Sequence, residues 1–220
     1  DRFDTGGLTA AVLGLTRGST GVVRLEAAGP PVRVPAISVT GFANEPLTDA
    51  TRPENRAWMR EVLAGAADSF DGEDRVAQAS EDARDVDAVV DSAVEAGLAW
   101  RKTPTHERAT RLRRAALGTV AARDRLFQVL AATTGRPASE LDAEVNDAVD
   151  AARYLGQLAD GLGAVRGAEF LPDTLALVVT SPEAPLGRAA EAVAAVLAAG
   201  SAVVLVAHPA VARVAAVLIE

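Results

Sequence analysis

Residues 175–205 read LALVVTSPEAPLGRAAEAVAAVLAAGSAVVL and indicate the fold class of the chain. The stretch TLALVVTS is an apolar run between two prolines, which is typical of a buried parallel strand. An alanine-rich helix is expected over 187–199, a second apolar strand over 201–207, and another helix over 209–220. This β-α-β-α order predicts an α/β fold that opens a doubly wound parallel sheet.

Two parallel strands alone leave an exposed apolar edge and cannot hold an independent core. We therefore expect more strands from the remainder of the polypeptide or from another subunit, and we expect a homo-oligomer. The chain begins at Asp1 instead of Met, and its last helix reaches Glu220 without a Gly, Asn or Pro to end it. Both ends therefore resemble cuts in a longer polypeptide.

Three amphipathic helices are expected before the strands, over about 82–99, 105–132 and 139–161, because apolar residues recur there at three- and four-residue spacing. Arginines of the second helix should point outward. The expected inward positions are Val86, Val89, Val90, Ala93, Val94 and Leu98, then Leu112, Ala116, Val120, Leu126 and Leu130, then Val145, Ala148, Val149, Ala152, Leu155 and Leu158.

An earlier helix is expected over 50–66, where Thr51 and Glu54 have capping-box spacing and Pro53 falls in the first turn. The stretch DSFDGEDR then interrupts the helical pattern.

The chain divides into three expected parts. Residues 1–41 form a β-rich N-terminal segment, in which TGVVRLEAA and VRVPAISV flank a Gly-Pro-Pro turn and predict a β-hairpin. Residues 42–165 are the helical part of the domain, and 166–220 are an incomplete Rossmann-like cofactor half.

Composition excludes several functions. The 220 residues carry a formal net charge of −8 and no cysteine, so disulfides, thiolate metal sites and a cysteine nucleophile are absent from this chain. An acidic chain lacks the basic face that nucleic-acid binding needs. With 24% charged residues and no apolar run near the length of a bilayer span, and with no signal peptide, we expect a cytoplasmic protein without a membrane span.

The turn SPEAPLGR after the first strand is where a nucleotide fingerprint should stand, but it lacks Gly-x-Gly-x-x-Gly. The glycine-rich GLGAVRG precedes that strand and is interpreted as an ordinary loop. His106 and His208 have no metal-ligand spacing, and both are expected to have surface or structural roles. Glu183 is the only carboxylate in the turn and is interpreted as solvated, so neither catalytic nor metal-binding residues are predicted.

Four segments together resemble the N-terminal part of the aldehyde dehydrogenase superfamily, in particular 1-pyrroline-5-carboxylate dehydrogenases and the dehydrogenase half of bifunctional proline-utilisation flavoenzymes. The segments are FANEPLTDATRPENRAW (42–58), DVDAVVDSAVEAGLAWRKTPTHERATRLRRAA (85–116), TGRPASELDAEVNDAVDAARYLGQLA (134–159) and the stretch 175–205 quoted above. Within the second segment, Trp100, Pro104 and Arg108 stand where the superfamily has them.

The resemblance implies NAD-dependent oxidation of glutamate semialdehyde to glutamate, in which a cysteine attacks the aldehyde and hydride passes to NAD. It also implies an asparagine after the first strand that helps to hold the oxyanion, and a lysine after the second strand that binds the adenosine ribose. This sequence departs at each position. Its Pro-Glu-Ala-Pro turn, 182–185, lacks the asparagine, Val206 replaces the lysine, and the nucleophile would lie beyond Glu220.

The positions that the resemblance leaves as cofactor contacts are Thr180, Ser181 and Pro182, through their backbone, and Val206. Two functions stay open. The chain is part of a working semialdehyde dehydrogenase that is inactive alone, or it is a degenerate, non-catalytic module with a structural or oligomerisation role. A free-standing acidic binding protein is a third, weaker reading.

Overall fold

A computed structural model describes residues 42–162 and 170–220, so the predicted N-terminal hairpin and most of the GLGAVRG loop lie outside the described residues. The described elements, in chain order, are α2 (Pro53–Ala64), η1 (Ala66–Asp68), α3 (Glu73–Asp82), α4 (Val86–Arg101), α5 (Thr105–Ala121), α6 (Arg123–Thr134), α7 (Ala138–Leu162), β1 (Leu175–Val179), α8 (Gly187–Ala199), β2 (Ala202–Val206), η2 (Pro209–Val211) and α9 (Ala212–Leu218).

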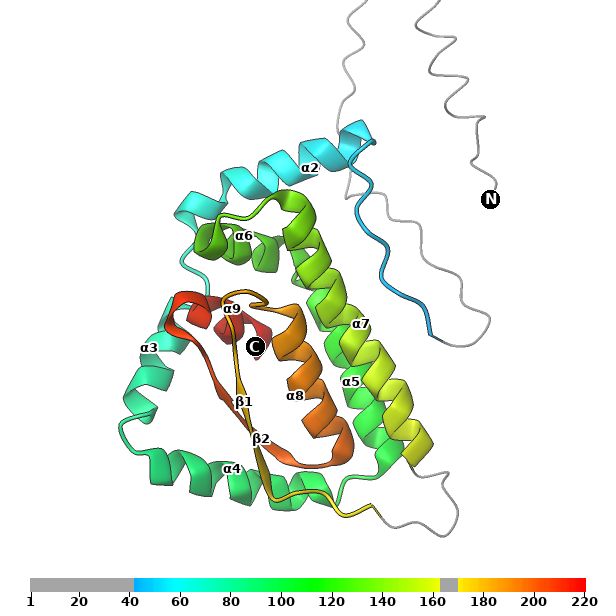
Figure 1. Cartoon of the computed structure of the whole chain (residues 1–220), viewed down its shortest axis with the longest axis vertical. Helices are drawn as coiled ribbons and strands as arrows, with labels where there is room; N and C mark the ends of the chain where they lie inside the picture. The colour runs from blue at the N-terminus through cyan, green and yellow to red at the C-terminus, as the bar shows by residue number, and fades with distance from the viewer. Residues whose placement is uncertain (1–41, 163–169) are drawn as a thin grey trace, which may run out of the picture.

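The two described strands pair in parallel, with Leu175 opposite Ala202 and Val179 opposite Val206. Helix α8 joins them, and both strands run toward the end of the molecule where α9 lies (Figure 1). The predicted α/β class and the β-α-β-α opening are therefore confirmed.

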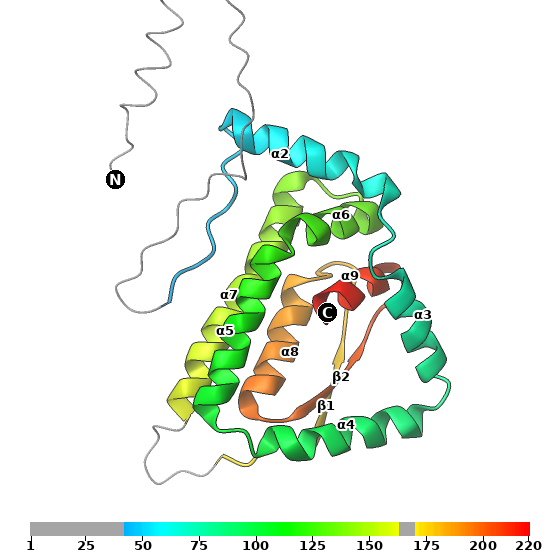
Figure 2. The ribbon, with the colours of Figure 1, turned by 180° about the vertical axis from the view of Figure 1, so that it is seen from behind.

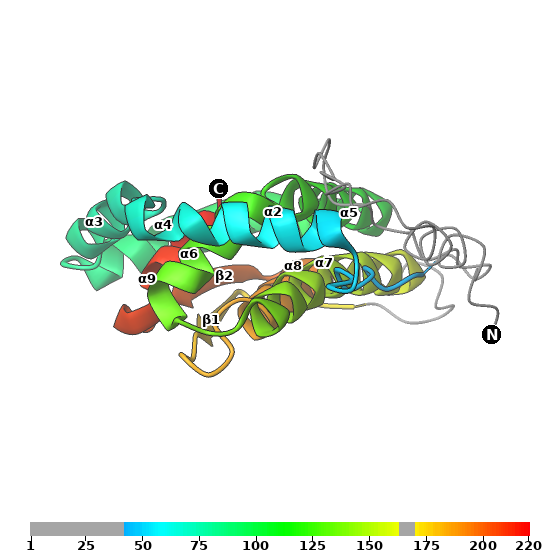
Figure 3. The ribbon, with the colours of Figure 1, turned by 90° about the horizontal axis from the view of Figure 1, so that it is seen from above.

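Helix α7 is the longest described helix. It packs against both α5 and α8, and the two opposite views show these three helices running along one another (Figures 1 and 2). Seen from above, α5 is stacked over the layer that α7 and α8 share (Figure 3). The main core lies where α2, α6, α7, α8 and α9 converge, and its largest fully buried side chains are Phe127, Leu126, Leu130, Leu141, Leu186, Val129, Val145, Val211 and Val214.

Helix α4 does not bury the stripe expected of it. Val86 and Leu98 are 64% and 52% exposed, and Gly97 is its only buried residue. The helix crosses the amino ends of the strands on its glycine side, since a Cβ on Gly97 would lie 2.7 Å from the Cβ of Ala202. Close approach at a glycine therefore replaces valine packing as the contact between α4 and β2.

The predicted helix over 105–132 is two helices, because the chain turns at Ala122 (φ −87°, ψ 8°). The turn brings Arg123 inward, where its guanidinium is paired with Asp142, and Arg108 is buried as well. The expectation of outward arginines is wrong at these two positions. The apolar spacing continues across the one-residue joint, so periodicity could not reveal it.

Four smaller features differ from the expectations. Helix α3 occupies part of the stretch interpreted as a break, and none of its residues is buried, so no apolar stripe could mark it. The capping box is wrong: α2 has no side-chain cap, and the Thr51 hydroxyl donates to Asp49 instead. Leu158, expected inward on α7, is 47% exposed. The last helix begins as the short η2 before α9.

Candidate functional site

The carboxyl ends of β1 and β2 are joined by Thr180. Its backbone N–H donates to the carbonyl of Val206 at 3.0 Å, and its buried hydroxyl oxygen accepts from the N–H of His208 at 2.7 Å. Ser181 and Pro182 follow directly in the turn. The structure thus gathers the four predicted cofactor positions at one edge of the strand pair.

Two charged residues that the sequence reasoning missed hold this turn, which spans residues 181–187. The Arg136 guanidinium donates to the carbonyls of Pro182 (3.0 Å) and Glu183 (2.6 Å). The Glu144 carboxylate accepts from the N–H groups of Leu186 (3.1 Å) and Gly187 (2.8 Å). Sequence spacing gave no signal for either residue, because both lie about 45 positions from the turn they contact.

The remaining polar side chains at this edge have structural partners. The Ser181 hydroxyl donates to the exposed Glu183 carboxylate, and this hydrogen bond lowers the pKa of Glu183. His208 Nδ1 accepts from the N–H of Ala210 at 3.2 Å and caps η2. His106 is exposed in the first turn of α5. Throughout residues 42–162 and 170–220, His, Asp and Glu form no group of three that could hold a metal ion.

The fit of this edge to NAD can be tested on its hydrogen-bonding groups. The free N–H groups at the start of a helix are a usual place for a nucleotide phosphate, but Glu144 occupies those of Leu186 and Gly187 at the start of α8. Val206 is 44% exposed and offers only methyl groups to a ribose. Two of the N–H groups that could meet a phosphate here are therefore already bonded to a carboxylate, and the side chain of Val206 offers no hydrogen bond to a ribose.

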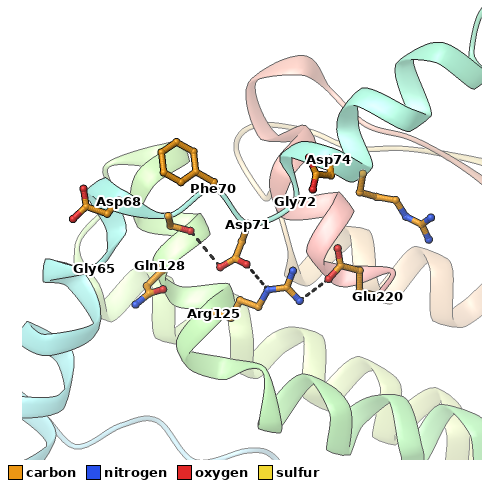
Figure 4. A pocket seen from close by; sticks show the side chains of 11 residues that line it. Gly65, Asp68, Phe70, Asp71, Gly72, Asp74, Arg125, Gln128 and Glu220 are labelled. Atoms are coloured by element: carbon orange, nitrogen blue, oxygen red, sulfur yellow. Dashed lines mark hydrogen bonds and ion pairs between the residues drawn. The ribbon is translucent and has the colours of Figure 1, made fainter.

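An open hollow lies away from this edge, where residues 65–75 face α6 and Glu220 (Figure 4). It measures about 490 Å³ and is lined by none of the four predicted positions. Arg125 crosses it and pairs with Asp71 (2.8 Å) and Glu220 (2.5 Å), which raises the pKa of the guanidinium. The charge of Arg125 is thus shared by two carboxylates of the lining.

A second polar centre holds residues 42–50, which we call the arm, against α7. Asp142, only 2% exposed, accepts from the N–H of Thr48 (2.6 Å) and from its hydroxyl (2.8 Å). The same carboxylate pairs with Arg123 at 2.7 Å. Two buried charges of opposite sign thus stand where the arm meets α7.

Further along α7, the arm is held by Asp150 and Arg153. The N–H of Glu45 donates to Asp150 at 2.5 Å, and the Glu45 carboxylate pairs with Arg153 at 2.8 Å. Burial raises the pKa of Asp150. The edge-to-face contact of Phe42 with Tyr154 adds apolar packing at the start of the arm.

The parallel strands β1 and β2, joined by α8 and covered by helices, define an α/β domain. Residues 66–220 match the aldehyde dehydrogenase family. Since the match covers more than half of the chain, the chain belongs to the aldehyde dehydrogenase family, as the resemblance predicted.

Three relatives illustrate the likeness. An α-ketoglutarate semialdehyde dehydrogenase of Haloferax volcanii is 34% identical over 131 residues, which cover 55% of this chain and 27% of that protein. Proline utilization A from Corynebacterium freiburgense is 28% identical with a TM-score of 0.62, over 80% of this chain and 17% of that one. The 1-pyrroline-5-carboxylate dehydrogenase from Thermus, with bound NAD, is 18% identical with a TM-score of 0.66, over 84% and 43%.

The likeness to the Thermus enzyme is one of fold. The chain spans about a quarter of the length of the curated relative and less than half of each of these two structures. Within residues 42–162 and 170–220, the helices are all too short or too polar to cross a bilayer.

Proposed function

We propose that the chain is a portion of an NAD-dependent dehydrogenase that oxidises L-glutamate γ-semialdehyde in proline catabolism, and that it is inactive alone. The arm carries this proposal. The stretch 42–58 resembles the start of the 1-pyrroline-5-carboxylate dehydrogenases, and within it Glu45 and Thr48 are bonded to α7 through buried charges. Two of the three relatives carry proline utilisation or 1-pyrroline-5-carboxylate in their names, and the third is also a semialdehyde dehydrogenase.

Inactivity of the chain alone follows from the side chains it has. It contains no cysteine to attack an aldehyde. The turn carries Glu183 and Ala184 but no amide side chain to stabilise an oxyanion. In this proposal the remainder of a longer polypeptide, or another subunit, supplies the nucleophile and further strands of the sheet in a cytoplasmic homo-oligomer, and 42–165 and 166–220 are its helical and cofactor parts.

NAD belongs to the proposed parent enzyme. The contacts that this chain offers are the backbone of Thr180, Ser181 and Pro182 and the apolar surface of Val206. Because Glu144 occupies the amides at the start of α8, we expect weak or absent binding of NAD by the chain alone.

A second function is favoured by the same turn: a degenerate aldehyde-dehydrogenase-like module that braces a neighbouring domain or an oligomer. Both flanks of the turn are bonded to protein groups, Arg136 and Glu144, and Val206 cannot bond a ribose hydroxyl.

Turnover and binding by the purified chain test the proposal. With 1-pyrroline-5-carboxylate and NAD, we expect no formation of NADH, and calorimetry should show no micromolar affinity for NAD. Formation of NADH would overturn the claim that the chain is inactive alone, and micromolar affinity would overturn the expectation of weak or absent NAD binding.

The coding sequence after Glu220 separates the two functions. A cysteine in a Gly-Gln-x-Cys-type loop supports the dehydrogenase, whereas a stop codon or a cysteine-free continuation supports the degenerate module.

A further inference from the structure

We propose that Arg136 and Glu144 are a pair of positioning residues that fix the conformation of the turn 181–187 at the candidate cofactor edge. The assignment of this edge to cofactor binding rests on the proposed function, but the contacts of Arg136 and Glu144 do not depend on it. The two residues come from outside the strand–helix unit: Arg136 lies in the loop before α7, and Glu144 in the second turn of α7.

Arg136 holds the first half of the turn. One guanidinium nitrogen, Nη2, donates to two successive carbonyl oxygens, those of Pro182 (3.0 Å) and Glu183 (2.6 Å). Carbonyl groups in a turn have no partner in regular secondary structure, so a single planar donor that serves both fixes the orientation of the peptide between them.

Glu144 holds the second half. Its Oε2 accepts from the N–H groups of Leu186 and Gly187, where α8 begins. The first N–H groups of a helix have no acceptor within the helix, and a carboxylate there also meets the positive end of the helix dipole. Helix α8 has no side-chain cap at Leu186 itself, so Glu144 takes that role from another helix.

The two halves are joined to each other. Arg136 Nη1 lies 3.5 Å from Glu144 Oε1, and their side chains are 25% and 13% exposed. Oε2 of Glu144 therefore binds the turn, whereas Oε1 faces Arg136. Because the guanidinium and the carboxylate orient each other, loss of either should loosen both halves of the turn.

Amide hydrogen exchange of the chain tests the role of Glu144. In Glu144→Ala, we expect exchange at Leu186 and Gly187 to rise at least about tenfold, since hydrogen bonds to a charged acceptor are lost. Glu144→Gln keeps an acceptor oxygen and should restore part of the protection.

Glu140→Ala is the matched control, because Glu140 lies one helical turn away and 4.0 Å from Arg136 but is 58% exposed. It should leave both amides unchanged.

Backbone relaxation tests Arg136. In Arg136→Ala, the order parameters of the amides of Glu183 and Ala184 should fall below about 0.6, the range of flexible backbone.

The proposal is overturned if Glu144→Ala changes exchange at Leu186 and Gly187 by less than twofold. It is also overturned if the exchange rate of the Val145 amide, in the buried part of α7, rises by the same factor. The variant would then loosen the structure in general and not the turn in particular. If Glu144→Ala does not fold, equal exchange in Glu144→Gln and the parent chain overturns it. None of these measurements involves NAD or turnover, so the proposed function and this proposal can fail separately.

Discussion

Removal of the Asp142 carboxylate should be among the most damaging single changes in this chain. Asp142→Ala takes away three short hydrogen bonds at once, from the N–H and hydroxyl of Thr48 and from Arg123. It also leaves the Arg123 guanidinium, 4% exposed, without its nearest carboxylate.

The expected loss in the free energy of unfolding depends on the partners that Arg123 retains. Breaking a buried ion pair by removing one partner costs about 3–5 kcal/mol. Arg123 retains the Asn146 side chain at 2.5 Å and the Glu45 carboxylate at 3.6 Å, so we expect the lower end, about 3 kcal/mol. A domain is stable by only about 5–15 kcal/mol, so this loss is a large fraction of the total.

Urea unfolding of parent and variant measures the difference. With a slope of about 2 kcal/mol per molar, a loss of 3 kcal/mol lowers the midpoint by about 1.5 M. The matched control is Asp160→Ala: Asp160 also lies on α7 and pairs with an arginine, Arg113, but its side chain is 39% exposed. Exposed pairs contribute about 0–1 kcal/mol. A loss below about 1 kcal/mol for Asp142→Ala, or one equal to that of the control, would refute the assigned role of the buried charges.

Three further changes have expected outcomes. Gly200→Ala should lower the free energy of unfolding by about 2 kcal/mol or more, because φ is +98° and the new Cβ would overlap the Arg108 guanidinium; an unchanged melting temperature would contradict this. Gly97→Val should cost about 1–3 kcal/mol by forcing α4 away from Ala202, to be measured by urea unfolding against Gly118→Ala, whose Cβ meets nothing within 4 Å. Burial and neighbouring carboxylates raise the pKa of Asp147, so the folded chain binds this proton more tightly than the unfolded chain. The site therefore favours folding below the ordinary pKa of 3.8 and loses that contribution as pH rises through the raised pKa. Asp147→Asn should then be more stable than the parent at pH 7, with the gain shrinking as pH falls toward 3.8; a gain that is independent of pH would refute the assignment.

The strand–helix–strand unit was predictable because its signals are local. Gly200 ends α8 in the left-handed conformation, and the predicted bounds of that helix, 187–199, are those observed. The apolar runs on either side place both strands to within two residues of their observed ends.

What the sequence could not show depends on contacts between distant residues. Arg136 and Glu144 look like ordinary surface charges in the sequence, and only the packing of α7 against α8 brings them to the turn. Arg123 was misplaced for the same reason, since its role depends on Asp142, 19 residues later. The valine stripe of α4 is periodic yet exposed at Val86, because periodicity says which face is apolar and not whether the described chain covers it.

The attachment of the arm also sets an order of events during synthesis. Glu45 and its acceptor Asp150 are 105 residues apart, and a ribosome that adds about 5–20 residues per second needs roughly 5–20 s to cover that distance. Before α7 emerges, its carboxylates are not there to accept hydrogen bonds from Glu45 and Thr48. The arm therefore stays undocked from α7 while α2 to α6 are made. Its docking then closes a loop of about 100 residues, whose entropy must be offset by the charged contacts with α7. The arm therefore cannot reach its native place before α7 has been made.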